Sequence, residues 1–217
     1  MAKGIGYLHS IEATHGDLKS VRFYPPPLPH PADSEWQPNI LIDPNGNPRL
    51  TDFGLSSVTR NLSANASTPD GRGSIRWRAP ELLALSTKKK AQEKVRSARP
   101  TSKSDAYSLA MVAIEVKFPR LTQNPVSQPP ENLQIFTGRH PFHSSTDEQV
   151  IVLLTKGLRP EKPDHEQFTP EMWSLTKKCW DKDPKKRPEI SEVLKKLESR
   201  DGTFCFVHRG MLAFAQE

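Results

Sequence analysis

The chain has 217 residues, enough for one domain with a hydrophobic core, and 35% of them are hydrophobic while 26% are charged. It contains no apolar run of about 18 residues and no apolar N-terminal segment, so we predict neither a membrane span nor a signal peptide. The formal net charge of +6 comes from Lys and Arg spread along the chain without aromatic-rich or zinc-finger patterns, so we predict no nucleic-acid partner. Two cysteines do not make a disulfide framework, and we therefore expect the cytosol or the nucleus.

The first predicted elements are a helix and a small hairpin. Residues 2–12 place Ile5, Leu8 and Ile11 on one face of a helix. Residues 39–43 are typical of a strand, the DPNG run at 43–46 is a strong turn signal, and residues 49–51 form the expected returning strand.

The rest of the pattern is helical. A helix predicted over 101–115 begins with Thr and Ser capping candidates and is apolar through 109–114, which is typical of a helix buried on all sides. Further helices are predicted over 147–156, 170–180 and 188–199. The last two begin with prolines that suit a first turn, after the capping candidates Thr169 and Arg187. We therefore predict a mainly α fold with one small β-hairpin.

Proline is concentrated in two segments. Residues 21–37 hold five of the 21 prolines and residues 116–134 hold four. Because proline extends neither helices nor central strands, we expect both segments to lie outside the folded core, and we expect no parallel sheet. Both begin with Val and end with Gln, whose codons can supply the GT and AG that bound an intron. We interpret them as introns translated in frame, with genuine loop insertions as the alternative.

Three segments carry groups suited to phosphoryl transfer. This chemistry needs metal ions held by oxygen ligands, a positive group near the moving phosphate and an acceptor for the hydroxyl proton. The HGDLK run at 15–19 offers the carboxylate of Asp17 and the ammonium of Lys19, and Asn39 offers an amide oxygen. The DFG run at 52–54 offers a second carboxylate, and the hairpin between Asn39 and Asp52 would bring the three segments to one edge.

In this order, the runs resemble the motifs of the eukaryotic protein kinases, over most of residues 1–197. The resemblance implies that Asp17 is the base or hydroxyl-orienting group and that Lys19 neutralises the transferring phosphoryl group. It also implies that Asn39 and Asp52 hold Mg²⁺ and that Leu41 forms part of the floor beneath the adenine of ATP.

The same resemblance assigns structural roles to residues outside the reacting groups. The GSIRWRAPE run at 73–81 would end the activation segment, and its last residue would pair with an arginine in the DPKKRP run at 183–188. An aspartate in the helix at 101–115 would anchor the backbone of the catalytic loop. The residues given such roles are His15, Phe53, Gly54, Glu81, Asp105 and Arg187.

The resemblance also bears on the substrate. Lys19 lies two residues after Asp17 and Ser74 lies six before Pro80, as in Ser/Thr kinases rather than Tyr kinases. The string from 104 to 142 resembles the tyrosine-kinase-like group, whose members are mostly Ser/Thr-specific. The implied reaction is ATP-dependent phosphorylation of Ser or Thr in a protein substrate.

Three departures from the family affect these expectations. We expect residues 1–200 to form only the C-terminal lobe, with a tail over 201–217, because the family's Gly-rich loop and N-lobe lysine have no counterpart in the sequence. Gly16 stands where many kinases have an Arg that receives an activation-segment phosphate. The insertion at 21–37 separates Lys19 from Asn39, and we expect it to misplace the metal ligands.

Other functions remain beside that of a Ser/Thr kinase. One is a pseudokinase-like binding module that docks partners without chemistry, although the intact Asp17, Lys19, Asn39 and Asp52 argue against it. Another is a gene-model fragment with no stable fold. Because the N-lobe groups that grip ATP have no counterpart, we do not expect the chain alone to be a competent kinase.

Overall fold

The computed structural model describes residues 1–19, 21–23, 39–43, 48–52, 57–58, 75–87, 99–115, 140–163 and 168–198, with only the backbone described at 21–23, 42, 57–58 and 84–87. The predictions for residues 116–134 and 201–217 fall outside this part of the chain, as do Phe53 and Gly54. Within the described ranges, no helix is both long and apolar enough to cross a bilayer.

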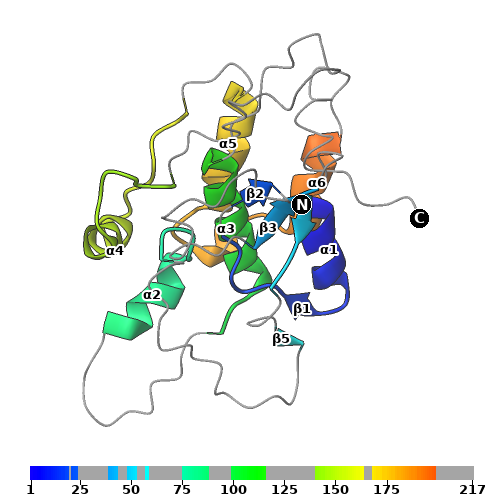
Figure 1. Cartoon of the computed structure of the whole chain (residues 1–217), viewed down its shortest axis with the longest axis horizontal. Coiled ribbons are helices and arrows are strands. Elements are labelled where there is room, and N and C mark those ends of the chain that lie inside the picture. Colours follow the sequence, from blue (N-terminus) through cyan, green and yellow to red (C-terminus); the bar gives the residue numbers. More distant parts are fainter. Residues whose placement is uncertain are drawn as a thin grey trace.

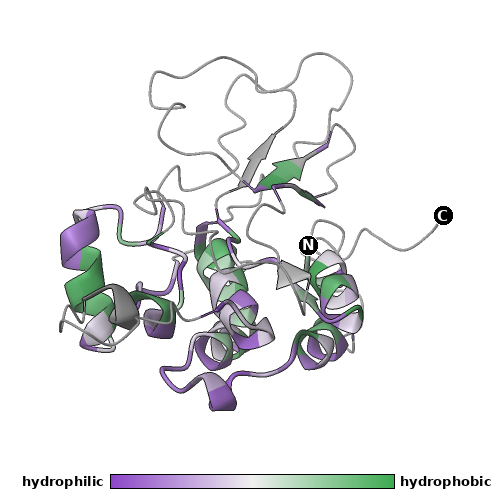
Figure 2. Cartoon of the chain, turned by 90° about the horizontal axis from the view of Figure 1, so that it is seen from below, coloured by the Kyte–Doolittle hydropathy of each residue, from purple (hydrophilic) through white to green (hydrophobic). Residues whose placement is uncertain are grey.

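The core is built around helix α3 (Ser102–Glu115), which carries 11 buried residues among its 14 and so confirms the helix predicted to be buried on all sides. Helix α5 (Pro170–Cys179) packs along it, and its last residue, Cys179, is only 3% exposed. Figures 1 and 2 show α3 in the middle of the molecule, with α4 on one side and α1 and α6 on the other. The predicted mainly helical pattern is therefore present around a single core.

Helix α1 (Ala2–Ser10) packs closely on its neighbours because two of its residues are glycines. A Cβ added at Gly4 would lie 3.0 Å from Cδ1 of Leu50, and one at Gly6 would lie 3.1 Å from Cδ1 of Leu194. The prediction that Ile11 shares the buried face is wrong, because the helix ends at Ser10 and the Ile11 side chain is 51% exposed.

The remaining helices follow the predicted pattern with two differences. Helix α4 (Asp147–Thr155) begins with a capping box between Thr146 and Gln149, and Thr169 caps α5 as predicted. Helix α2 (Pro80–Thr87) was not predicted. Helix α6 (Ile190–Glu198) begins two residues later than predicted, since its first hydrogen bonds run from Glu192 and Val193 to the Glu189 carbonyl. Residues 184–186 form a separate 3₁₀ turn, η3 (Pro184–Lys186). Arg187 follows that turn with a buried side chain, so it is not the cap of α6.

The strands form two small sheets. Strands β1 (Ala13–Thr14) and β5 (Ser57–Val58) pair antiparallel, and a second sheet has the order β2-β3-β4. In that sheet β3 (Ile40–Ile42) and β4 (Pro48–Leu50) pair antiparallel, which confirms the predicted hairpin.

Strand β2 (Val21–Phe23) contradicts the expectation that the whole first insertion lies outside the fold. It pairs parallel with β3, with Val21 opposite Ile40 and Phe23 opposite Ile42, so the prediction of no parallel sheet is also wrong. The physical reason is local, since the three residues precede the first proline of the segment, Pro25, and every backbone N–H is available for pairing. Residues 24–37 of the insertion lie outside the described ranges.

Candidate active site

The candidate site lies at one edge of the β2-β3-β4 sheet, where β2 and β3 begin and β4 ends. Backbone hydrogen bonds continue the sheet beyond the strands. The Asn39 N–H donates to the Lys19 carbonyl at 3.2 Å, and the Thr51 N–H donates to the Asn39 carbonyl at 2.9 Å. Lys19, Asn39 and Thr51 therefore lie side by side, and Asp52 follows directly.

The side chains of Asp17, Lys19 and Asn39 are in direct contact. Lys19 Nζ lies 3.2 Å from Asp17 Oδ2, and Asn39 Nδ2 donates to the Asp17 carbonyl at 2.6 Å and to Asp17 Oδ2 at 3.2 Å. The Asp17 side chain is 12% exposed and that of Lys19 is 17% exposed, so both are shielded but reachable. The expectation that the insertion displaces Asn39 from this group is wrong, because Asn39 is held in the sheet between Lys19 and Thr51.

Asn39 also presents an oxygen suited to a metal ion. Its Nδ2 is committed to Asp17, and its Oδ1 is buried with no hydrogen-bond partner within the described ranges. A buried polar atom without a partner is destabilising by about 1–3 kcal/mol unless a ligand satisfies it. Amide and carboxylate oxygens are ligands that Mg²⁺ prefers, and Mg²⁺ commonly takes only one or two from protein and the rest from phosphates and water. Asn39 and Asp52 fit that pattern, although the described residues contain no cluster of three His, Cys, Asp or Glu.

Leu41 lies on the face of the sheet opposite to the core. Ile40 is fully buried and packs into the core, and successive side chains on a strand point to opposite faces. The partly buried Leu41 is therefore placed where an apolar surface beside the sheet edge could contact a flat ring.

His15 connects the loop at 15–19 to the end of β4. It is fully buried, and its Nε2 lies 3.1 Å from the Thr51 carbonyl. The Asp17 N–H donates to His15 Nδ1 at 3.4 Å, so Nδ1 accepts, and the hydrogen of the imidazole is assigned to Nε2, which donates to the Thr51 carbonyl. The imidazole thus fixes Asp17 relative to the residue that precedes Asp52.

Asp105 holds the same loop from α3. Its Oδ2 accepts from the His15 N–H and its Oδ1 accepts from the Gly16 N–H, both at 2.9 Å. Gly16 has a φ of +79°, a left-handed conformation that glycine adopts at little cost. His9, on α1, also approaches Asp105, with Nε2 at 2.9 Å from Oδ2. No role was predicted for His9, since nothing in the helical spacing of α1 distinguishes it.

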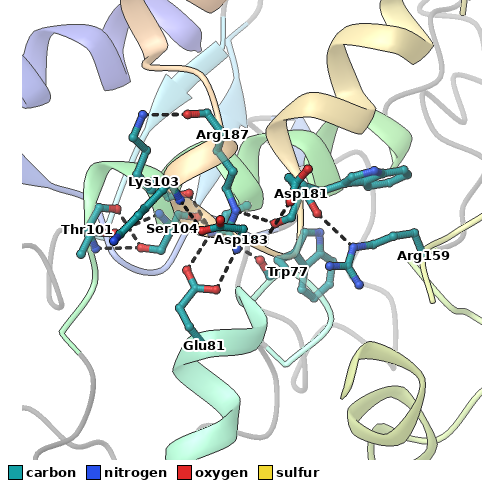
Figure 3. Close-up of polar contacts among 12 residues, drawn as sticks. Trp77, Glu81, Thr101, Lys103, Ser104, Arg159, Asp181, Asp183 and Arg187 are labelled. Carbon is teal, nitrogen blue, oxygen red and sulfur yellow. Dashed lines mark hydrogen bonds and ion pairs between the residues drawn. The ribbon is translucent and has the colours of Figure 1, made fainter. Parts of the chain in front are cut away.

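A second polar cluster joins α2, α3 and η3 (Figure 3). Arg187 donates from Nη1 and Nη2 to the two carboxylate oxygens of Glu81, at 2.7 and 2.8 Å. It also donates to the carbonyls of Asp181 and Lys103, at 2.9 and 3.0 Å, and its side chain is fully buried. Its guanidinium lies 5.0 Å from the ring centre of Tyr107, which is on α3, the helix that also carries Asp105.

Arg76 is a buried connector for which no role was predicted. It donates to the carbonyls of Pro141, Phe142 and Ser145, at 3.2, 2.7 and 2.7 Å. It also forms an ion pair of 3.0 Å with Asp147, in the first turn of α4. Its place inside the run at 73–81 was visible in the sequence, but its partners are about 65–71 residues away. Sequence spacing alone gives no signal for such a contact.

The chain matches the protein tyrosine and serine/threonine kinase family over residues 37–197. It is 30% identical, over 91% of its length, to a probable serine/threonine-protein kinase of Dictyostelium discoideum. It is 28% identical to a serine/threonine-protein kinase of Arabidopsis thaliana over 91% of its length, and 28% identical to guanylyl cyclase C of Cavia porcellus over 94%. The matched part makes up 9%, 25% and 14% of those three proteins, so the chain spans a minor part of each.

Proposed function

The chain belongs to the protein tyrosine and serine/threonine kinase family, and we propose that it is the part of a serine/threonine kinase that holds Mg²⁺ and the phosphate-accepting hydroxyl group. The observation that carries this proposal is the contact group of Asp17, Lys19 and Asn39 at the sheet edge. Phosphoryl transfer depends mainly on positioning and charge stabilisation, which this group can supply.

In the proposed mechanism, each side chain has one task. The Asp17 carboxylate, held by the Asn39 amide and the Lys19 ammonium, orients the substrate hydroxyl and accepts its proton. Lys19 balances the negative charge on the transferring phosphoryl group. Asn39 and Asp52 would hold Mg²⁺, which when bound neutralises charge on the phosphates of ATP. Leu41 would provide the apolar surface beneath the adenine.

The proposed acceptor is Ser or Thr in a protein, within the tyrosine-kinase-like group. The spacing of Lys19 after Asp17 and of Ser74 before Pro80 supports this choice. The names of the Dictyostelium and Arabidopsis relatives also support it, since both are serine/threonine-protein kinases. The family itself includes tyrosine kinases, so the acceptor rests on these two observations.

A binding module without chemistry is the second candidate. Guanylyl cyclase C is named for another reaction, yet 14% of it matches 94% of this chain. A segment of this kind therefore occurs in a protein whose name does not refer to protein phosphorylation. In this alternative, the segment would dock partners and Asp17 would have no catalytic task.

The test is transfer of labelled phosphate from MgATP to Ser- and Thr-containing proteins by the protein expressed from its own transcript. Asp17→Asn keeps the side-chain volume and removes the negative charge, so transfer should fall by at least about 100-fold while the fold is retained. Folded wild-type protein that transfers no phosphate to any Ser or Thr would favour the binding module instead.

A further inference from the structure

We propose that β2 (Val21–Phe23) is a positioning strand that holds Lys19 against Asn39 across the insertion at 21–37. The expectation that β2 affects nucleotide binding rests on the proposed function. The expectation that β2 fixes the backbone of Lys19 beside that of Asn39 does not. The segment was expected to separate the two residues, yet the structure brings them within a hydrogen bond of each other.

The register of the sheet explains how this is achieved. Val21, Ile40 and Leu50 are paired at the edge next to the candidate site, whereas Phe23, Ile42 and Pro48 are paired at the opposite edge. The chain therefore enters the sheet two residues after Lys19 and leaves it at the edge away from the site. The rest of the insertion, residues 24–37, begins only after three residues have paired with β3.

The length of the insertion agrees with this arrangement. A parallel pair needs a crossover of roughly a dozen residues or more, because the chain must return to the edge at which it started. Residues 24–38 provide 15 residues between the end of β2 and Asn39. A strand of three residues is only about 10 Å long, so this connection is ample for the return.

The parallel ladder also offsets the cost of closing a long loop. The Asn39 N–H donates to the Lys19 carbonyl across 20 positions of the chain, and ordering so long a loop for a single bond is entropically unfavourable. The three paired residues of β2 add neighbouring hydrogen bonds to the same closure. The position of Lys19 relative to Asn39 is then set by a ladder rather than by one bond.

A proline scan of the full 217-residue chain tests this role. Consecutive N–H groups of a strand point to opposite sides, so proline removes a ladder bond at alternate positions and is tolerated between them. The alternation can take two forms. In one, Val21→Pro and Phe23→Pro are disruptive and Arg22→Pro is the matched control. In the other, Arg22→Pro alone is disruptive and the two other variants are the controls. At the disruptive positions, hydrogen exchange of the Asn39 amide should become about tenfold faster. The amide of Met111 in the core should be unchanged, which shows that the fold is retained.

The phosphate-transfer test of the proposed function separates the two conclusions. If the alternating pattern appears in the Asn39 exchange rates while the protein expressed from its own transcript transfers no phosphate to Ser or Thr, β2 is a positioning strand and the proposed function is wrong. If phosphate is transferred but no proline, or every proline equally, changes the exchange of Asn39 in the 217-residue chain, the positioning role is overturned. If both hold, the disruptive prolines should weaken MgATP binding by the 217-residue chain severalfold.

Discussion

Asp52 has a left-handed backbone, with a φ of +57°, at the position proposed to bind metal. Such a conformation is uncommon outside glycine and costs on the order of 1 kcal/mol or more, and it often marks functional positions. The surrounding sheet fixes this conformation, because Thr51 is bonded to Asn39 on one side and to His15 on the other. The backbone thereby fixes the direction of the Cα–Cβ bond from which the carboxylate extends.

Two substitutions of Asp52 separate the effect of its backbone conformation on stability from the effect of its carboxylate on metal binding. Asp52→Gly and Asp52→Ala both remove the carboxylate, so both should abolish binding of Mg²⁺–nucleotide. The glycine variant should nevertheless be more stable than the alanine variant by about 1 kcal/mol, because only glycine adopts the left-handed region without strain. Urea denaturation of the two variants measures this difference. Equal stabilities would show that the positive φ carries no strain.

Tyr107 is a fully buried side chain whose hydroxyl has no hydrogen-bond partner within the described part of the chain. Its ring lies against two cations, with the guanidinium of Arg187 at 5.0 Å and that of Arg159 at 5.3 Å from the ring centre. We therefore expect the ring of Tyr107 to stabilise the folded state and its hydroxyl group to contribute no stability. Tyr107→Phe should leave the free energy of unfolding unchanged or raise it by up to about 1 kcal/mol, whereas Tyr107→Leu should lower it.

Tyr107 also makes stability depend on alkaline pH. Burial is the main reason that the pKa of Tyr107 is raised above its ordinary value of 10.0. The unfolded chain can release this proton above pH 10 while the folded chain keeps it, so stability is fully present below pH 10 and declines as the pH rises further. The decline should be smaller in Tyr107→Phe when the free energy of unfolding is measured between pH 9 and 11. An identical pH profile in the two proteins would contradict this assignment.

At the scale of elements, the Glu81–Arg187 pair connects α2 to η3 and to the core helix α3. The Arg187 side chain is fully buried and that of Glu81 is 29% exposed, so removing the carboxylate leaves a buried charge unpaired. Glu81→Gln should therefore lower the free energy of unfolding by about 3 kcal/mol. Arg187→Lys should also be destabilising, because an ammonium cannot donate to both oxygens in the fork geometry.

A double-mutant cycle tests whether this loss comes from the pair itself. Adding Arg187→Met to Glu81→Gln removes the unpaired charge, so the double variant should be less destabilised than the sum of the two single variants. Additive losses in guanidinium denaturation would show that the two side chains act independently.

Local sequence signals predicted the elements that local chemistry determines. The hairpin followed from the turn residues at 43–46, and the start of α5 followed from the capping residue Thr169. Helix α2 was missed although Pro80 at its first position and Glu81 in its first turn were visible signals. Strand β2 could not be predicted, because three residues followed by prolines have no periodicity and their partner lies 19 positions away.

In the candidate site too, local sequence signals predicted some features, while others depend on contacts between distant residues. The residue types and the order of Asp17, Lys19, Asn39 and Asp52 indicated the chemistry, because phosphoryl transfer needs those groups. The contact between Lys19 and Asn39 across the insertion could not be predicted, since it depends on the pairing of β2. Arg76 was missed for a similar reason, since its partners come from a distant loop and from α4.

At the scale of the whole molecule, the chain should bind nucleotide weakly. We expect these 217 residues to lack the family's Gly-rich loop and N-lobe lysine, which donate to the phosphates. Each charge-assisted hydrogen bond contributes about 1.5–3 kcal/mol, so the absence of two or three lowers the affinity by about two to six orders of magnitude. Calorimetry on the 217-residue chain with Mg²⁺ should give a Kd for ATP of about a millimolar or weaker. Micromolar binding that Asp52→Ala abolishes would contradict this expectation.

The burial of Cys179 in the core has a practical consequence for following the integrity of the fold. Burial raises the pKa of this thiol to about 12, so at pH 8 only about one molecule in ten thousand carries the reactive thiolate. In a chain carrying Cys205→Ser, alkylation by iodoacetamide would therefore proceed only through openings that expose the end of α5. The labelling rate, followed by mass spectrometry, then reports the fraction of molecules in which the core is open, and the measurement needs no nucleotide or substrate.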